Sequence, residues 1–226
     1  MSFSALIVAG GSGARFGLKK QFLDLLGIPV LKRSVSCLDA NTAIDRLVVV
    51  VPEEDISRTR QMLADMGKEL VITKGGITRQ ESVMNGLQYA HESHAVLIHD
   101  GVRPIVSSIL IDRVIGGLEG VDGCIPALEV TDTLKKAHNG MVVKTIPRAS
   151  LYQVQTPQAF VTKTLLEAHE RALQDGSLRF TDDSALLEAA GKTIRIVEGD
   201  PLNVKITFKD DIIMAEAILR CRTGLE

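Results

Sequence analysis

Residues 5–21, Ala-Leu-Ile-Val-Ala-Gly-Gly-Ser-Gly-Ala-Arg-Phe-Gly-Leu-Lys-Lys-Gln, join an apolar segment directly to a glycine-rich loop. The first three glycines of this loop lack Cβ atoms, so backbone N–H groups can converge there on an anion. One arginine and two lysines in the same loop add positive charge. The stretch therefore predicts a buried strand that ends in a phosphate-binding loop, as in α/β proteins that bind nucleotides.

Two other phosphate loops are excluded by their spacing. The pattern Gly-x-x-x-x-Gly-Lys-Ser/Thr occurs nowhere in the chain, and Gly-x-Gly-x-x-Gly fails because Phe16 stands where Gly11-x-Gly13 requires its third glycine. A dinucleotide-binding dehydrogenase also needs an acidic residue after its second strand, and here Val51-Pro52 ends the apolar run 46–51. The loop thus favours a different class of nucleotide enzyme.

Length and charge limit the classes of protein that fit. The chain has 226 residues, enough for one α/β domain over 1–226 with a small appendage. Its 26 Lys and Arg against 28 Asp and Glu give a formal charge of −2, so no overall basic field attracts nucleic acid or an anionic membrane. Aromatic residues make up 4% and Trp is absent, which argues against a protein that stacks single-stranded bases.

Cysteine usage and hydropathy predict a cytoplasmic protein. Cys37, Cys124 and Cys221 are odd in number and far apart, so they form neither a zinc pattern nor a disulfide framework. No apolar run approaches the roughly 18 residues of a membrane span, and no basic leader precedes the first strand. We therefore expect a soluble protein with no membrane partner.

Hydrophobic periodicity alternates between strand and helix along the first half of the chain. β-Branched apolar runs of strand length occur at 3–9, 46–51, 69–73 and 95–98. Segments with helical periodicity lie between and after them, near 30–39, 53–66, 79–91 and 107–119. This alternation predicts an α/β fold with a mostly parallel sheet flanked by helices.

The second half begins with a different pattern. Cys124–Leu128 is typical of a strand, and two further strand-like runs flank Ala-His-Asn-Gly at 137–140, which favours a β-hairpin. A two-stranded projection is marginally stable alone, so we expect an arm over 130–150 that packs on a second subunit in a homodimer. Helices are then expected near 162–174, 182–190 and 209–222, with a strand at 193–197.

A carboxylate follows the strand at 95–98. His99-Asp100-Gly101-Val102-Arg103-Pro104 begins where that apolar run ends, and ligands of open α/β sheets lie beyond the carboxyl ends of strands. Asp100 and Arg103 should therefore face the same crevice as the glycine loop. Mg²⁺ favours one or two carboxylates together with phosphate oxygens, so Asp100 is a candidate metal ligand.

Two more segments carry polar groups at junctions of strands and helices. Gly75-Gly76-Ile77-Thr78 opens a helix that contains Ser82, and its N–H groups and the Ser82 hydroxyl are candidates to contact a base or ribose. Lys205 stands between Val204 and Ile206 and is a candidate for the phosphate site.

Five motifs together resemble one family, the cytidylyltransferases of polyol phosphates, and within it most closely the methylerythritol 4-phosphate cytidylyltransferases of non-mevalonate isoprenoid biosynthesis. The resemblance spans nearly the whole chain, and the order and spacing of the motifs make it specific. The motifs are the glycine loop ending in Lys20-Gln21-Phe22, His99-Asp100-x-x-Arg103-Pro104, Gln155-Thr156-Pro157-Gln158-Ala159-Phe160, Thr181-Asp182-Asp183, and Val197-Glu198-Gly199-Asp200 with Asn203-Val204-Lys205-Ile206-Thr207.

The resemblance implies a Rossmann-like nucleotidyltransferase fold and a reaction. A phosphate oxygen of methylerythritol 4-phosphate attacks the α-phosphorus of CTP, pyrophosphate leaves, and CDP-methylerythritol forms with the help of Mg²⁺. It also implies site roles, carried over position by position: Arg15, Lys20 and Lys205 as catalytic residues; Ala9, Gly10, Gly11, Gly13, Gly76, Ser82 and Gly101 around the nucleotide; Arg103, Thr133, Arg148, Thr181 and Lys205 around the polyol phosphate, with Thr133 and Arg148 supplied by the partner's arm; and Asp100 at the metal.

The chain departs from the family pattern at three positions. Lys19 replaces the usual proline, which loosens the loop or adds a cation, and Gly101 replaces an alanine, a small loss of volume. Ile77 stands where an acidic residue is common, so any contact made by that carboxylate is lost. Of the implied roles, selectivity for the nucleotide base is the one that this change would affect most.

Two rival functions remain open from the sequence. A ribitol-5-phosphate cytidylyltransferase shares the fold and the loop, and the choice of polyol depends on the placement of side chains. A non-catalytic nucleotide sensor would be expected to have lost Arg15, Lys20 or Asp100, and all three are intact.

Overall fold

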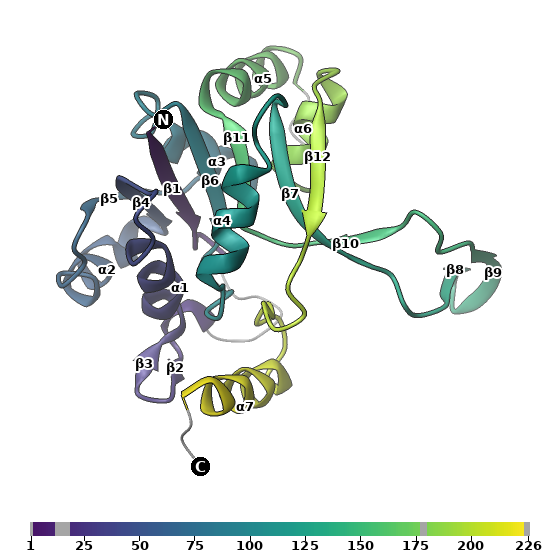
Figure 1. Cartoon of the computed structure of the whole chain (residues 1–226), viewed down its shortest axis with the longest axis horizontal. Coiled ribbons are helices and arrows are strands. Elements are labelled where there is room, and N and C mark those ends of the chain that lie inside the picture. The colour runs from purple at the N-terminus through teal and green to yellow at the C-terminus, as the bar shows by residue number, and fades with distance from the viewer. Residues whose placement is uncertain (1, 12–18, 177–179, 224–226) are drawn as a thin grey trace.

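A twisted eight-stranded sheet forms the centre of the described part of the chain (Figure 1). The computed structural model describes residues 2–11, 19–176 and 180–223. The strands of this sheet are β1 (Phe3–Val8), β4 (Arg46–Val51), β5 (Glu69–Lys74), β6 (Ala95–Asp100), β7 (Gly123–Glu129), β10 (Tyr152–Val154), β11 (Gln158–Val161) and β12 (Ile194–Glu198). The order is β10-β7-β11-β6-β1-β4-β5, with β12 paired to β7.

The predicted α/β fold with a mostly parallel sheet is confirmed. β1 pairs in parallel with β4 on one side and β6 on the other, and β5 extends the parallel set beyond β4. The carboxyl ends of these strands therefore lie at one edge of the sheet, where the glycine loop after β1 begins.

Helices cover both faces of the sheet (Figure 1). Alternate residues of the strands supply the two cores: Leu47 and Val49 of β4 pack on one face, and Val48 and Val50 on the other. The first core is completed by α1 (Val30–Asp39), α2 (Ile56–Met62) and α4 (Ser108–Gly116), and the second by α3 (Arg79–Leu87), α5 (Thr162–Gln174) and α6 (Asp183–Ala189).

Two short strands of the central sheet escaped the sequence analysis. β11 lies antiparallel between β6 and β7, and β10 pairs antiparallel with the end of β7. The segment Gln158–Val161 is four residues long and almost wholly buried, so it shows no alternation of polar and apolar residues that would mark a strand. Two-residue strands β2 (Asp24–Leu25) and β3 (Ile28–Pro29) form a separate small hairpin.

The predicted hairpin is present as β8 (Leu134–His138) and β9 (Met141–Ile146). Asn139 and Gly140 both have positive φ, at 48° and 76°, as a tight turn between antiparallel strands requires. The hairpin projects away from the body of the molecule (Figure 1), and Met141, Val142 and Val143 on β9 are exposed.

The closing helix α7 (Asp210–Thr223) packs on the small hairpin, and its Ala215 shares a third apolar cluster with Leu25 and Ile206. Two 3-10 turns complete the described elements, η1 (Lys20–Phe22) and η2 (Glu53–Asp55). Among the described residues, no helix combines the length and the apolar character that crossing a membrane requires.

Candidate active site

A cavity of about 420 Å³ lies beyond the carboxyl ends of β1 and β6. Segments from both halves of the chain meet there, because the parallel strands end at the same edge of the sheet. Its lining residues are Val8, Ala9, Gly10, Gly11, Lys20, Gln21, Gly76, Ile77, Thr78, Arg79, Ser82, Asp100, Val102 and Lys205. Eight of the residues selected from the sequence are among them: Ala9, Gly10, Gly11, Lys20, Gly76, Ser82, Asp100 and Lys205.

The two glycine turns of the cavity meet at the Ser82 hydroxyl. Ser82 Oγ donates to the carbonyl of Thr78 at 2.9 Å and accepts the Gly76 N–H at 3.1 Å. A Cβ on Gly75 would come within 2.9 Å of this oxygen, and one on Gly10 within 3.3 Å. Both glycine turns thus close on one hydroxyl, and a side chain at Gly75 would crowd it more than one at Gly10. The proton of Ser82 is engaged in the turn, so the hydroxyl can offer a ligand only an acceptor.

Gly101 is packed more tightly than the sequence analysis expected. The Gly101 N–H donates to the carbonyl of Val8 at 2.9 Å, which continues the β1–β6 ladder beyond its last pair. A Cβ at Gly101 would lie 2.9 Å from Ala9 Cβ and 3.0 Å from Leu31 Cδ1. Glycine at this position is therefore required by packing in this chain and is not merely a tolerated loss of volume.

The end of the glycine loop is fastened on both sides of Lys20. Gln21 is buried, and its Nε2 donates to the carbonyl of Ala9 at 3.3 Å. The Lys19 ammonium contacts Glu54 at 2.9 Å and Asp55 at 2.6 Å. Lys19 thus adds a cation, one of the two expected effects, and among the described residues this cation contacts η2 and does not line the cavity.

Asp100 is the buried carboxylate of the cavity. Its Oδ2 lies 2.8 Å from Lys205 Nζ and 3.5 Å from Arg103 Nε. Burial alone would raise the pKa of Asp100, but the charges of Lys205, Arg79 and Arg103 outweigh that effect and hold the pKa well below its usual range. Asp100 is consequently an anion at neutral pH.

A neutral histidine fixes the backbone beside Asp100. Burial lowers the pKa of His99 to about 4, so the imidazole carries one proton. Its Nε2 lies 3.1 Å from the carbonyl of Arg103, which can only accept, and this assigns the proton to Nε2. Nδ1 then accepts from Thr156 Oγ1 at 3.1 Å, and the same oxygen accepts the Asp100 N–H at 3.0 Å. His99 thus has a structural role.

The loop that carries Lys205 is held to the sheet by two amides. Gln155 pairs with the backbone of Asp200, donating to its carbonyl at 2.9 Å and accepting its N–H at 3.0 Å. Asn203 donates to the carbonyl of Thr156 at 2.7 Å and is fully buried. These contacts explain why the third and fifth motifs of the sequence occur together, and they bring Lys205 to Asp100.

Other predicted residues lie outside the cavity lining. Arg103 is buried behind Asp100, where its Nη1 donates to the carbonyl of Asn203 at 2.8 Å. Thr181 is exposed before α6. Thr133 and Arg148 are exposed at the base of the arm, where Arg148 donates to the carbonyl of Thr131. Gly13 and Arg15 fall outside the described residues.

Arg79 lines the cavity and was given no role from the sequence. It is the first residue of α3, and its Nη1 lies 2.7 Å from Oδ2 of Asp183. The available signal was its place directly after the second glycine turn, at the start of a helix. Its partner could not be foreseen, because Asp183 lies 104 residues away in the chain.

A magnesium site was expected at Asp100. Among the described residues there is no cluster of three or more His, Cys, Asp or Glu side chains that could hold a metal alone. Mg²⁺ is commonly bound by one or two carboxylates with phosphate and water oxygens, and a single buried anion that lines the cavity fits that mode. The donor set is therefore adequate for a metal that arrives with a nucleotide.

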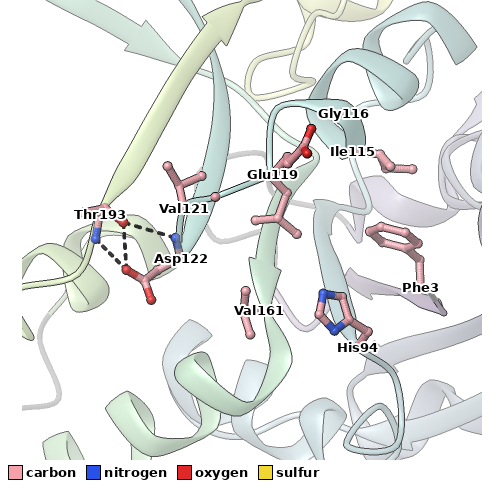
Figure 2. A pocket seen from close by; sticks show the side chains of 11 residues that line it. Phe3, His94, Ile115, Gly116, Glu119, Val121, Asp122, Val161 and Thr193 are labelled. Carbon is pink, nitrogen blue, oxygen red and sulfur yellow. Dashed lines mark hydrogen bonds between the residues drawn. The ribbon is translucent and has the colours of Figure 1, made fainter.

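A larger cavity, of about 600 Å³, opens at the opposite ends of β1 and β6 (Figure 2). Phe3 and His94 line one side, and Asp122, hydrogen-bonded to Thr193, lines the other. None of its described lining residues is Lys or Arg. A triphosphate needs cations, so electrostatics favours the smaller cavity as the candidate site.

Comparison with known proteins agrees with the motifs. Residues 3–221 match the family model described as 2-C-methyl-D-erythritol 4-phosphate cytidylyltransferase. A protein of that name from Geobacillus kaustophilus is 42% identical over 98% of this chain and 99% of its own length. A bifunctional IspD/IspF enzyme from Bartonella henselae is 39% identical over 97% of this chain, which corresponds to 57% of that longer protein.

Solved structures show the same fold. The cytidylyltransferase of this name from Thermus thermophilus is similar with a TM-score of 0.82 and 34% identity, covering 97% of this chain and all of that one. A 4-diphosphocytidyl-2C-methyl-D-erythritol synthase from Anaerococcus prevotii gives a TM-score of 0.85 and 32% identity, covering 96% and 98%. With the cavity, its cations and its buried carboxylate in view, these matches show that the chain belongs to the 2-C-methyl-D-erythritol 4-phosphate cytidylyltransferase family.

Proposed function

We propose that the cavity between the glycine loop and Asp100 is where this chain performs the reaction of its family, the transfer of a cytidylyl group from CTP to 2-C-methyl-D-erythritol 4-phosphate. The observation that carries the proposal is the convergence of Lys20, Arg79 and Lys205 with the two glycine turns on one cavity. Cations beside converging N–H groups suit a polyphosphate. The reaction supplies isoprenoid biosynthesis and is proposed to take place in the cytoplasm.

The transfer needs no protein nucleophile. A phosphate oxygen of the polyol phosphate forms a bond to the α-phosphorus of CTP, and the bond from that phosphorus to the β-phosphate bridging oxygen breaks, releasing pyrophosphate. Charge develops on the phosphoryl oxygens, so Lys20 and Arg15 are proposed to stabilise it and Lys205 to place the attacking phosphate. Arg103, Thr181 and Gly101 are proposed to shape the surrounding subsites.

Magnesium is proposed as the cofactor, held by Asp100 together with phosphate oxygens. When bound, the ion would neutralise phosphate charge. Asp100 is suited to this role because the surrounding cations keep it ionised, and because its backbone N–H is fixed on Thr156.

The arm is proposed to complete the site of a second subunit. It projects from the body (Figure 1), and exposed Met141, Val142 and Val143 give it an apolar strand that requires cover. Thr133 and Arg148 at its base would then reach the polyol phosphate of the partner, where a guanidinium suits a phosphate monoester. This makes the enzyme a homodimer with shared sites.

Pyrophosphate release tests the function. The purified protein is given Mg²⁺ and CTP with either 2-C-methyl-D-erythritol 4-phosphate or ribitol 5-phosphate, and CTP is then replaced by UTP, ATP and GTP. We expect turnover with CTP and the methylerythritol phosphate. Turnover with the ribitol phosphate alone would reassign the substrate, and no turnover with either would favour the nucleotide sensor. The nucleotide series shows whether Ile77 has relaxed base selectivity.

Mixing two inactive variants tests the shared site. Arg148→Ala and Lys20→Ala dimers are exchanged, so that heterodimers contain one site with both lesions and one with neither. Activity that returns towards half of wild type per heterodimer supports the arrangement. No recovery in demonstrably exchanged dimers, or a monomer in solution, would exclude it.

A further inference from the structure

A buried chain of polar contacts runs from the core into the cavity. His169 on α5 lies with Nε2 3.2 Å from Oδ1 of Asp183, and the other carboxylate oxygen lies 2.7 Å from Nη1 of Arg79. The side chains of His169 and Asp183 are 0% and 2% exposed, whereas that of Arg79 is 30% exposed and lines the cavity. This series of contacts thus has two residues in the core and one at the cavity.

The directions of the hydrogen bonds follow from the chemistry of the groups. Burial alone would raise the pKa of Asp183, but Arg79 and the hydrogen bond from His169 outweigh it and lower the pKa, so Asp183 is an anion. A carboxylate only accepts, so His169 donates from Nε2. Its buried Nδ1 has no partner among the described residues. An unpaired buried nitrogen is unfavourable, so packing alone gives no reason for histidine here.

Arg79 keeps donors available for a ligand. Among the described residues, Nη1 is the one nitrogen of its guanidinium that has a hydrogen-bond partner. Its backbone is fixed, because Thr78 caps α3 and accepts the Glu81 N–H at 3.1 Å while Glu81 accepts the Thr78 N–H at 3.2 Å. With the backbone and Nη1 held, the remaining N–H groups have a set direction.

We propose that His169 and Asp183 are positioning residues that hold the Arg79 guanidinium against the nucleotide, with Arg79 donating to an oxygen of CTP. This inference rests on the proposed function for the identity of the nucleotide. It also gives a role to the Thr181-Asp182-Asp183 motif: Asp182 caps α6 through the Ala185 N–H at 3.0 Å, and Asp183 aims the arginine.

A double-mutant cycle in CTP affinity distinguishes positioning from general stabilisation. Arg79→Met, Asp183→Ala and the double variant are compared with wild type by calorimetric titration with CTP and by steady-state kinetics. If Asp183 acts through Arg79, each single variant raises the Kd and KM for CTP about tenfold, and the double variant is no weaker than Arg79→Met alone. The KM for the polyol phosphate should change less than twofold. Effects that multiply in the double variant overturn the proposal.

His169 provides a second, independent arm. His169→Gln keeps an N–H donor near the position of Nε2 and should retain CTP affinity within about twofold. His169→Leu removes the donor and should raise the Kd for CTP at least threefold in the Arg79 background and not in Arg79→Met. Equal CTP affinity for the Leu and Gln variants would overturn the proposal, even if Asp183→Ala does not fold.

Asp182→Asn is the matched control, because it removes a neighbouring carboxylate of the same helix without touching the Arg79 hydrogen bond. It should keep the Kd for CTP within twofold. If the wild-type protein binds CTP but gives no turnover, the proposed function is refuted. The double-mutant cycle can then still be measured from the Kd values for CTP. A wild-type protein that fails to bind CTP would overturn the positioning role as well.

Discussion

The ion pair between Lys205 and Asp100 should stabilise the fold as well as the reaction, and Lys205→Met tests both. The side chain of Lys205 is 45% exposed and that of Asp100 is 13% exposed, and the Lys205 ammonium lies 2.8 Å from the Asp100 carboxylate. A hydrogen bond to a charged group contributes about 1.5–3 kcal/mol, and the exposure of Lys205 reduces this through screening by solvent. We therefore expect the free energy of unfolding to fall by about 1–2 kcal/mol at pH 7, with most turnover lost.

The assay is urea unfolding of wild type, Lys205→Met, Asp100→Asn and the double variant, with Lys209→Met as the control for losing an exposed lysine of the same segment. Removing Lys205 leaves a buried carboxylate with fewer cations, so neutralising Asp100 in that background should recover stability. The double variant should lose about 1–2 kcal/mol less than the sum of the single losses. Additivity within about 0.5 kcal/mol would refute a coupled pair.

The pH dependence supplies a second check on the same pair. The pKa of Asp100 in the folded protein lies below its ordinary value of 3.8, so its contribution to stability is present above that value and is lost as pH falls below it. Lys205→Met raises the folded pKa. The difference in unfolding free energy between wild type and variant should therefore shrink as the pH falls from neutral to below 3.8. A constant difference would assign the effect of the variant to packing.

Three further predictions concern residues around the cavity. The pKa of His99 is lowered from 6.5 to about 4, so the stabilisation by neutral His99 is present above pH 6.5 and is lost as the pH falls towards 4. In urea unfolding, the wild-type protein should therefore lose up to about 3 kcal/mol of unfolding free energy over that range, and His99→Asn should lose less. Gly101→Ala should destabilise by about 1–3 kcal/mol by thermal melting, since its Cβ would meet Ala9 at 2.9 Å; an unchanged Tm would show that the packing yields. Iodoacetamide at neutral pH should label exposed Cys221 first and spare Cys124, whose pKa burial raises to about 11; mass spectrometry of peptides decides, and early labelling of Cys124 would contradict its burial.

The parallel half of the fold could be predicted because the residues of its strands show strand-like patterns by themselves. Runs such as Arg46–Val51 are β-branched and bounded by turns, and the helices between them have apolar faces. The hairpin could be predicted from Asn139-Gly140, whose positive φ values few other residues adopt. In both cases a few neighbouring residues contain the information.

Features that depend on contacts between residues far apart in the sequence could not be predicted from short sequence patterns. The Asp183–Arg79 contact joins residues 104 apart, and β11 is defined by the two strands that flank it. The tight fit of Gly101 depends on Leu31, which belongs to α1 and lies far from Gly101 in the sequence. The sequence indicated Asp100 and Lys205 as candidates for the metal and the phosphate, but the ion pair between them comes only from the fold.

At the proposed site, local charge would allow a protein with a net charge of −2 to bind a polyphosphate. Among the described lining residues, Lys20, Arg79 and Lys205 stand against one carboxylate, Asp100. Carboxylates lie beside cations of this lining: Asp183 contacts Arg79, and Asp100 contacts Lys205. Burial of neutral His99 prevents a further positive charge from appearing beside Asp100 above about pH 4. The charged groups of Arg79 and Lys205 are thus held in place before any anion arrives, which is a condition for electrostatic preorganisation.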